Sequence, residues 1–113
     1  MSGLKRGSVA VVGAAESDLG QVAPHTSPLD MMAQATLRAL DDCGLKLSDI
    51  DGIFSATSQV RLSPLALAEY LRMKPNYFDG TVIGGSSFMT HVANAQGAIQ
   101  AGLCEVALIT YGS

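Results

Sequence analysis

The chain has 113 residues, of which 48% are hydrophobic and 15% are charged, with a formal net charge of −3 at pH 7. This length suffices for one domain with its own core, and the hydrophobic content excludes a disordered segment. The acidic balance, without any basic cluster, argues against a nucleic-acid or anionic-membrane binder. The low charged fraction predicts surface that more chain or a partner covers.

Cysteine usage and the N-terminus indicate a cytoplasmic protein without a membrane span. Cys43 and Cys104 have no Cys or His nearby at metal-ligand spacing, so we expect two small core residues and no metal site. The first apolar run is too short for a signal peptide. Residues 80–104 carry no charge, but their glycines and polar side chains argue against a spanning helix.

Strand and helix signals alternate along the chain. The clearest helix begins at Ser27, which can cap it, has Pro28 at its first position and stops at Gly44. In chain order the prediction is strand 8–12, loop 14–26, helix 27–44, strand 52–56, helix 63–72, strand 81–83, a helix from about residue 86, and strand 106–110. The order β-α-β-α-β-α-β predicts an α/β fold with a mixed or mainly parallel sheet and helices on both faces. Because the last predicted strand has nothing to cover it, we expect residues 1–113 to be a fragment or one piece of a larger assembly.

The last predicted helix is unusual because it has no charged face. Between Asp79 and Glu105 there is no Asp, Glu, Lys or Arg, and small residues occupy most positions of the helix. A surface helix would show one apolar stripe and one charged face. We therefore expect this helix to be buried all round, with only its N-terminus exposed.

The turn that leads into this helix is the strongest site candidate. Gly84, Gly85, Ser86 and Ser87 stand where unpaired helix amides can stabilise an anion or a developing oxyanion, and the glycines allow a ligand close to the backbone. The alternative is a tight turn with a serine cap, which needs no ligand.

Other candidate residues have plainer interpretations. The stretch 9–20 follows a predicted strand but lacks the G-x-G-x-x-G fingerprint, because Ala15 and Asp18 stand where glycines are needed, so nucleotide binding is disfavoured. His91 is expected to be a satisfied core residue and His25 an exposed loop residue.

At this point the motifs resemble the thiolase superfamily, in particular its lipid-transfer-protein thiolase branch of acetyl-CoA acetyltransferase-like proteins. The resemblance is carried by GGSSFMTHVANAQGAIQAGLCEVALITYGS, in which residues 98–102 match the family's A-I-x-x-G helix end and residues 105–108 match its next strand. It implies that residues 1–113 form the N-terminal part of a layered αβαβα thiolase domain, with the helix from residue 86 between two sheets. It also implies a homodimer, and a missing half that holds the catalytic His and a second Cys.

One departure from the family pattern bears on the chemistry. The family's nucleophilic cysteine falls on Gly85, and Ser86 beside it has no visible base to activate it. Relatives with glycine at this position are retro-aldolases that cleave β-hydroxyacyl-CoA with a small OB-fold, acyl-CoA-binding partner. The resemblance therefore implies a protein that acts on coenzyme A thioesters by C–C bond cleavage or formation, without Cys thiolysis and without a covalently bound cofactor.

Two alternatives remain open. The chain is an acetyl-CoA acetyltransferase or thiolase proper with a cysteine supplied from elsewhere, or it is a non-catalytic subunit that binds coenzyme A esters or supports a partner. In the leading interpretation, residues 84–87 shape the pocket and the catalytic groups lie beyond residue 113.

Overall fold

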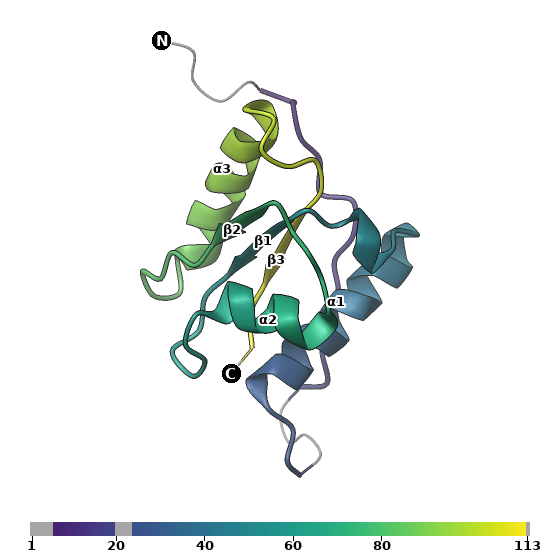
Figure 1. Ribbon diagram of the computed structural model, residues 1–113, viewed down its shortest axis with the longest axis vertical. Helices are drawn as coiled ribbons and strands as arrows, with labels where there is room; N and C mark the ends of the chain where they lie inside the picture. The colour runs from purple at the N-terminus through teal and green to yellow at the C-terminus, as the bar shows by residue number, and fades with distance from the viewer. Residues whose placement is uncertain (1–5, 20–23, 113) are drawn as a thin grey trace.

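The predicted α/β fold is confirmed by the structure, a computed structural model that describes residues 6–19 and 24–112. Its elements are α1 (Pro28–Cys43), the 3-10 helix η1 (Leu47–Asp49), β1 (Gly52–Ser55), α2 (Ser63–Leu71), β2 (Tyr77–Asp79), α3 (Ser87–Gln100) and β3 (Ala107–Thr110). The three strands form a sheet in the order β2-β1-β3, and both neighbours run parallel to β1. The sheet lies between α3 on one face and α1 with α2 on the other (Figure 1).

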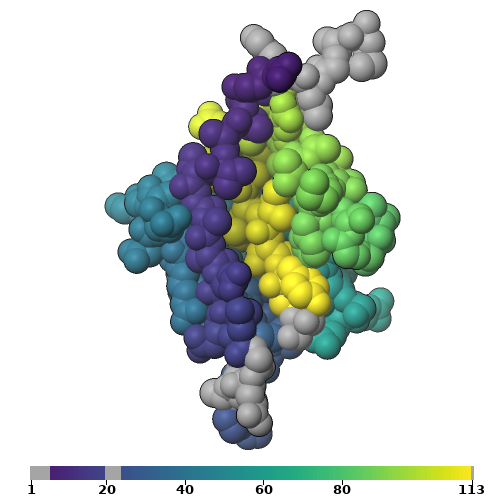
Figure 2. Space-filling model, turned by 180° about the vertical axis from the view of Figure 1, so that it is seen from behind, coloured from purple at the N-terminus to yellow at the C-terminus, as the bar shows by residue number. Residues whose placement is uncertain are grey.

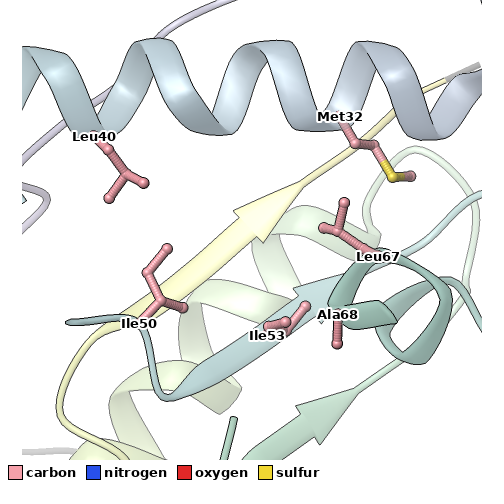
Figure 3. Close-up of a cluster of buried hydrophobic side chains, with 6 residues drawn as sticks. All are labelled: Met32, Leu40, Ile50, Ile53, Leu67 and Ala68. Atoms are coloured by element: carbon pink, nitrogen blue, oxygen red, sulfur yellow. The ribbon is translucent and has the colours of Figure 1, made fainter. Parts of the chain in front are cut away.

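The two faces of the sheet are covered by different apolar clusters. Ile53 of β1 points to the first cluster, which α1 and α2 complete (Figure 3); its members are Met32, Leu40, Ile50, Ile53, Leu67 and Ala68. The next residue, Phe54, belongs to the second cluster, formed with Ala95 and Ala98 of α3. This alternation follows from the two-residue period of a strand. The side chains of Ile53 and Phe54 are both fully buried, as expected for a strand covered on both faces.

The first helix follows its sequence signals closely. The Ser27 side chain accepts a hydrogen bond from the Asp30 amide, and the Asp30 carboxylate accepts one from the Ser27 amide, which makes a capping box. Gly44 ends the helix with a positive φ of 74°. The second helix departs from its prediction in detail, because Leu62 occupies the N-cap position without a side-chain cap and Ser63 lies inside the helix.

Asp51 joins the three strands where they begin. Its carboxylate accepts hydrogen bonds from the amides of Glu105 (2.9 Å) and Val106 (2.8 Å), at the start of β3. Its carbonyl accepts hydrogen bonds from the amides of Asn76 (2.7 Å) and Tyr77 (3.1 Å), at the start of β2. One residue therefore sets the register of both neighbours against β1.

The predicted strand at residues 8–12 is wrong for the described structure. These residues form no strand, and Val11 and Val12 are 85% and 63% exposed rather than covered on both faces. The segment runs beside β3 over the surface (Figure 2) and is held by side chains, for example by a 2.8 Å hydrogen bond from Ser8 Oγ to Gln100. β3 is an edge strand that pairs with β1 only, but no backbone hydrogen bond joins it to residues 8–12 among the described residues, so the β-branched run lies beside the sheet without joining it.

The strand predicted at residues 81–83 is also wrong in its position. The strand found in this region is β2, and only Ile83 makes an isolated bridge, with Gly85. The reason is register: the Asp51 carbonyl accepts hydrogen bonds from the amides of Asn76 and Tyr77, so the strand begins at Tyr77. The more β-prone Thr-Val-Ile run lies past the end of β1 and has no partner there.

The third helix is buried on one face only, which differs from the expected burial on all faces. Its buried side chains are Ser87, His91, Ala95 and Ala98. Met89 and Val92 on the opposite side are 76% and 47% exposed. Among the helices that the structure describes, none combines the length and apolar character that a membrane crossing requires.

Candidate functional site

The predicted turn lies where α3 begins, and it is exposed. Gly84 adopts a positive φ of 86°, a conformation that glycine reaches without strain. A Cβ atom added at Gly85 would meet no heavy atom within 4 Å, so this position opens to solvent rather than to the core. Ser86 is exposed as well, whereas Ser87 is fully buried. The sequence prediction of an accessible helix N-terminus is therefore confirmed.

Neither serine caps α3, so the serine-cap alternative is wrong in its detail. Ser86 stands at the N-cap position but makes no side-chain hydrogen bond to the helix. The hydroxyl of Ser87 points backwards, donating to the Gly84 carbonyl at 2.7 Å and accepting from the Ile83 amide at 2.8 Å. It stabilises the turn instead of the helix end.

Some of the amides expected to bind an anion are already occupied. The Ser87 amide donates to the Gly84 carbonyl at 3.0 Å, and the Met89 amide donates to the Ser86 carbonyl at 3.1 Å. The positive end of the α3 dipole still lies at this turn, next to the exposed backbone of Gly85 and Ser86. A developing negative charge here would be stabilised mainly by the helix dipole, because some of the backbone amides already donate to other acceptors.

A row of polar side chains on α3 holds the chain that leads to the turn. We call residues 79–84 the approach segment, and Ser87, His91 and Asn94 the polar stripe. These three residues follow the i, i+4, i+7 spacing that normally carries an apolar helix face. His91 Nε2 donates to the Thr81 carbonyl at 3.0 Å, and Asn94 Nδ2 donates to the Asp79 carboxylate at 2.8 Å.

His91 was expected to be a satisfied core residue, but it is only half satisfied. Its side chain is fully buried between aromatic rings, with centroids 5.6 Å from Phe88 and 6.1 Å from Phe54. Its Nδ1 is the one buried side-chain polar atom in the described residues that has no hydrogen-bond partner. The sequence signal for this residue was a lone histidine in an uncharged helix, which did not reveal its contacts.

Asp79 anchors the start of the approach segment. One carboxylate oxygen accepts from the amide (2.8 Å) and the hydroxyl (2.5 Å) of Thr81, and the other accepts from Asn94. Partial burial opposes ionisation of Asp79, but these hydrogen bonds, with a smaller effect of His91, outweigh it and hold the pKa below its ordinary value. The carboxylate is therefore charged at neutral pH and fixes the segment at one end.

The remaining reactive side chains lie away from the turn. Cys104 is buried beyond the far end of α3, where burial raises the pKa of its thiol, and the nearby Asp51 charge raises it further. Cys43 is half-buried at the end of α1, and His25 is exposed, as expected. In the described part of the chain, neither Ser86 nor Ser87 has a histidine or carboxylate partner that would activate it.

Comparison with known proteins supports the fold strongly. The sequence matches no protein-family model and no curated protein. The structure resembles a monomeric SCP2-thiolase-like protein type 1 from Mycobacterium smegmatis, with a TM-score of 0.68 and 25% identity over 87% of this chain and 22% of that one. It also resembles an Ltp2–ChsH2(DUF35) aldolase, with a TM-score of 0.67 and 26% identity over 89% of this chain and 28% of that one.

A third solved structure extends the likeness. It is a 3-oxoacyl-[acyl-carrier-protein] synthase III from Aquifex aeolicus, with a TM-score of 0.68 and 24% identity over 79% of this chain and 30% of that one. All three have the thiolase fold, and the chain has a thiolase-like fold in turn. It spans between about a fifth and a third of their lengths. The resemblance stated from the sequence is thus confirmed at the level of fold.

Proposed function

We propose that this thiolase-like chain belongs to an enzyme that acts on acyl-CoA thioesters as a retro-aldolase, cleaving a C–C bond without a cysteine nucleophile. The observation that carries the proposal is Gly85. It lies exposed at the start of α3, with room for a side chain, and the turn around it contains no thiol. The two cysteines of the chain lie elsewhere in the fold.

Retro-aldol chemistry fits a site of this kind because it needs no covalent enzyme intermediate. A base removes the proton from the β-hydroxyl group of a 3-hydroxyacyl-CoA, and the Cα–Cβ bond breaks. Its electron pair passes to the thioester carbonyl as an enolate, which then takes a proton at Cα. The products are an aldehyde or ketone and a shortened acyl-CoA, so atoms and charge balance without a nucleophile.

The turn before α3 would stabilise the enolate. The negative charge develops on the thioester oxygen, and the positive end of a helix dipole stabilises such a charge. In this proposal Gly84, Gly85 and Ser86 leave the space that the thioester occupies, and Ser87 keeps the turn in place. The general base comes from residues outside the described part of the chain.

The proposed partner is a small OB-fold protein that binds acyl-CoA. Its support is the likeness to the Ltp2–ChsH2(DUF35) aldolase, which is named for two components. A homodimer and a cytoplasmic location belong to the same proposal. A thiolase proper and a non-catalytic scaffold remain as alternatives, and the assay below distinguishes them.

The test is a product analysis of the full-length protein, alone and with a candidate OB-fold partner from the same source. The substrates are a 3-hydroxyacyl-CoA, and a 3-ketoacyl-CoA supplied with free coenzyme A. We expect the first to yield an aldehyde or ketone and a shortened acyl-CoA in equal amounts by mass spectrometry.

Two results contradict the proposal. Cleavage of the 3-ketoacyl-CoA that depends on free coenzyme A and passes through an acylated cysteine identifies a thiolase. Binding of both thioesters, measured by calorimetry, without any cleavage identifies a scaffold subunit.

A further inference from the structure

The approach segment is held along its whole length by one face of α3. Asn94 holds Asp79, His91 holds Thr81, and Ser87 holds both Ile83 and Gly84. The segment runs antiparallel to α3, so each successive side chain of the helix contacts an earlier position in the segment. The segment ends at the exposed turn, whose position therefore depends on these contacts.

The contact of His91 defines the hydrogen-bonding role of its Nε2 atom. The Thr81 oxygen is a carbonyl and can only accept, so Nε2 must carry the proton. Nδ1 has neither a donor nor an acceptor opposite it. The hydrogen bond from Nε2 is thus the one polar contact of the ring that the described residues provide.

Filling the core does not explain a histidine at this position. The space between Phe54 and Phe88 is aromatic and closed, and an apolar side chain would fill it without burying an unpaired nitrogen. A buried polar atom without a partner destabilises a fold. What an apolar residue could not supply is the N–H group that reaches the Thr81 carbonyl.

We propose that His91 is a positioning residue, which fixes the Gly84–Ser86 turn by donating its Nε2 proton to Thr81. Ser87 and Asn94 hold the segment on either side of this contact. His91 does not touch the substrate; it acts through the backbone of the approach segment. Its effect on turnover rests on the proposed function, whereas its effect on the segment does not.

The test compares His91→Leu, which removes the donor, with His91→Gln, which retains a side-chain N–H that can reach the carbonyl. Ile99→Val serves as the matched control, because Ile99 packs on the same helix against the Phe54 cluster and away from the polar stripe. Hydrogen exchange of peptides covering residues 79–87 is measured by mass spectrometry in the full-length protein. The value of kcat/KM for the 3-hydroxyacyl-CoA is measured beside it.

We expect exchange in residues 79–87 to rise about tenfold in His91→Leu, in line with the loss of one buried hydrogen bond. In His91→Gln and Ile99→Val it should stay within about twofold of the unchanged protein. The kcat/KM value should fall about tenfold in His91→Leu and recover in His91→Gln. If His91→Leu does not fold, His91→Met replaces it, since its flexible side chain adapts to the same space.

Three hydrogen-exchange results overturn the proposal. These are unchanged exchange in His91→Leu, an equal rise in the leucine and glutamine variants, and an equal rise in Ile99→Val. A rise in exchange without a fall in kcat/KM also overturns the positioning role. If the unchanged protein cleaves no acyl-CoA, the proposed function fails, and the exchange measurement still decides whether His91 holds the segment.

Discussion

Introducing a cysteine at Gly85 is the most direct perturbation of the exposed turn. A Cβ atom at Gly85 would have no heavy atom within 4 Å, and its backbone is not in the left-handed region. Replacing glycine where the backbone suits other residues stabilises a protein by about 0.4–1 kcal/mol. We therefore expect Gly85→Cys to fold with a stability equal to or slightly above that of the unchanged protein.

The new thiol should be unusually acidic. It would lie two residues before Ser87, the first residue of α3, at the positive end of the helix dipole. Thiols at helix N-termini have pKa values of about 3.5–7.5, against about 8.5 for a free cysteine. We expect alkylation by iodoacetamide to rise with a midpoint below about pH 7.5.

The matched control is Gly84→Cys, one residue away. Gly84 has a φ of 86°, so a side chain there is strained and should cost about 1–2 kcal/mol. Thermal unfolding followed by circular dichroism compares the two variants, and peptide mapping separates the new thiol from Cys43 and Cys104. A destabilised Gly85→Cys, or an alkylation midpoint near pH 8.5, would refute the described geometry of the turn.

Three further predictions concern stability. Hydrogen bonds lower the pKa of Asp79 in the folded protein, so its ionised form stabilises the fold at pH values above the ordinary pKa of about 3.9. This stabilisation is lost as the pH falls through the folded pKa. Asp79→Asn should therefore remove this acid dependence from thermal unfolding. Asp51→Ala should cost about 2–3 kcal/mol in chemical denaturation because the amide of Val106 loses its charged acceptor, and a loss below about 0.5 kcal/mol would contradict that role. Gly52→Ala should cost about 1–3 kcal/mol because its Cβ would lie 2.9 Å from Cys104 Sγ; adding Cys104→Ala should recover part of the loss, and equal melting temperatures for the single and double variants would argue against the clash.

The sequence predicted those elements whose ends are set by residues close by in the chain. The bounds of α1 could be predicted because Ser27, Pro28 and Gly44 act within one or two turns of the chain. The position of β2 could not, because its register depends on a contact with Asp51, which is distant in sequence. Residues 8–12 have the composition of a strand, but composition does not state whether the run will pair with the edge of the sheet that lies beside it.

The exposed turn before α3 was predictable in its location and not in its construction. Two glycines and two serines before an uncharged helix indicated the exposed turn, and the structure confirms it. The direction of the Ser87 hydroxyl, which turns back to Gly84, follows from the fold of the approach segment rather than from residue type. The role of His91 was missed for the same reason, because its partner Thr81 is a backbone carbonyl and leaves no mark in the sequence.

The order of the strands has a consequence for synthesis on the ribosome. The central strand, β1, is made first, and both of its neighbours follow it in the chain. The hydrogen bond from the Val106 amide to the Asp51 carboxylate cannot form until Val106, 55 residues later in the chain, has been synthesised. One edge of β1 can pair once β2 has left the exit tunnel, and the other edge stays open until β3 follows. A chain stalled before residue 106 would present one unpaired edge of the apolar strand β1, where a chaperone could protect it from aggregation.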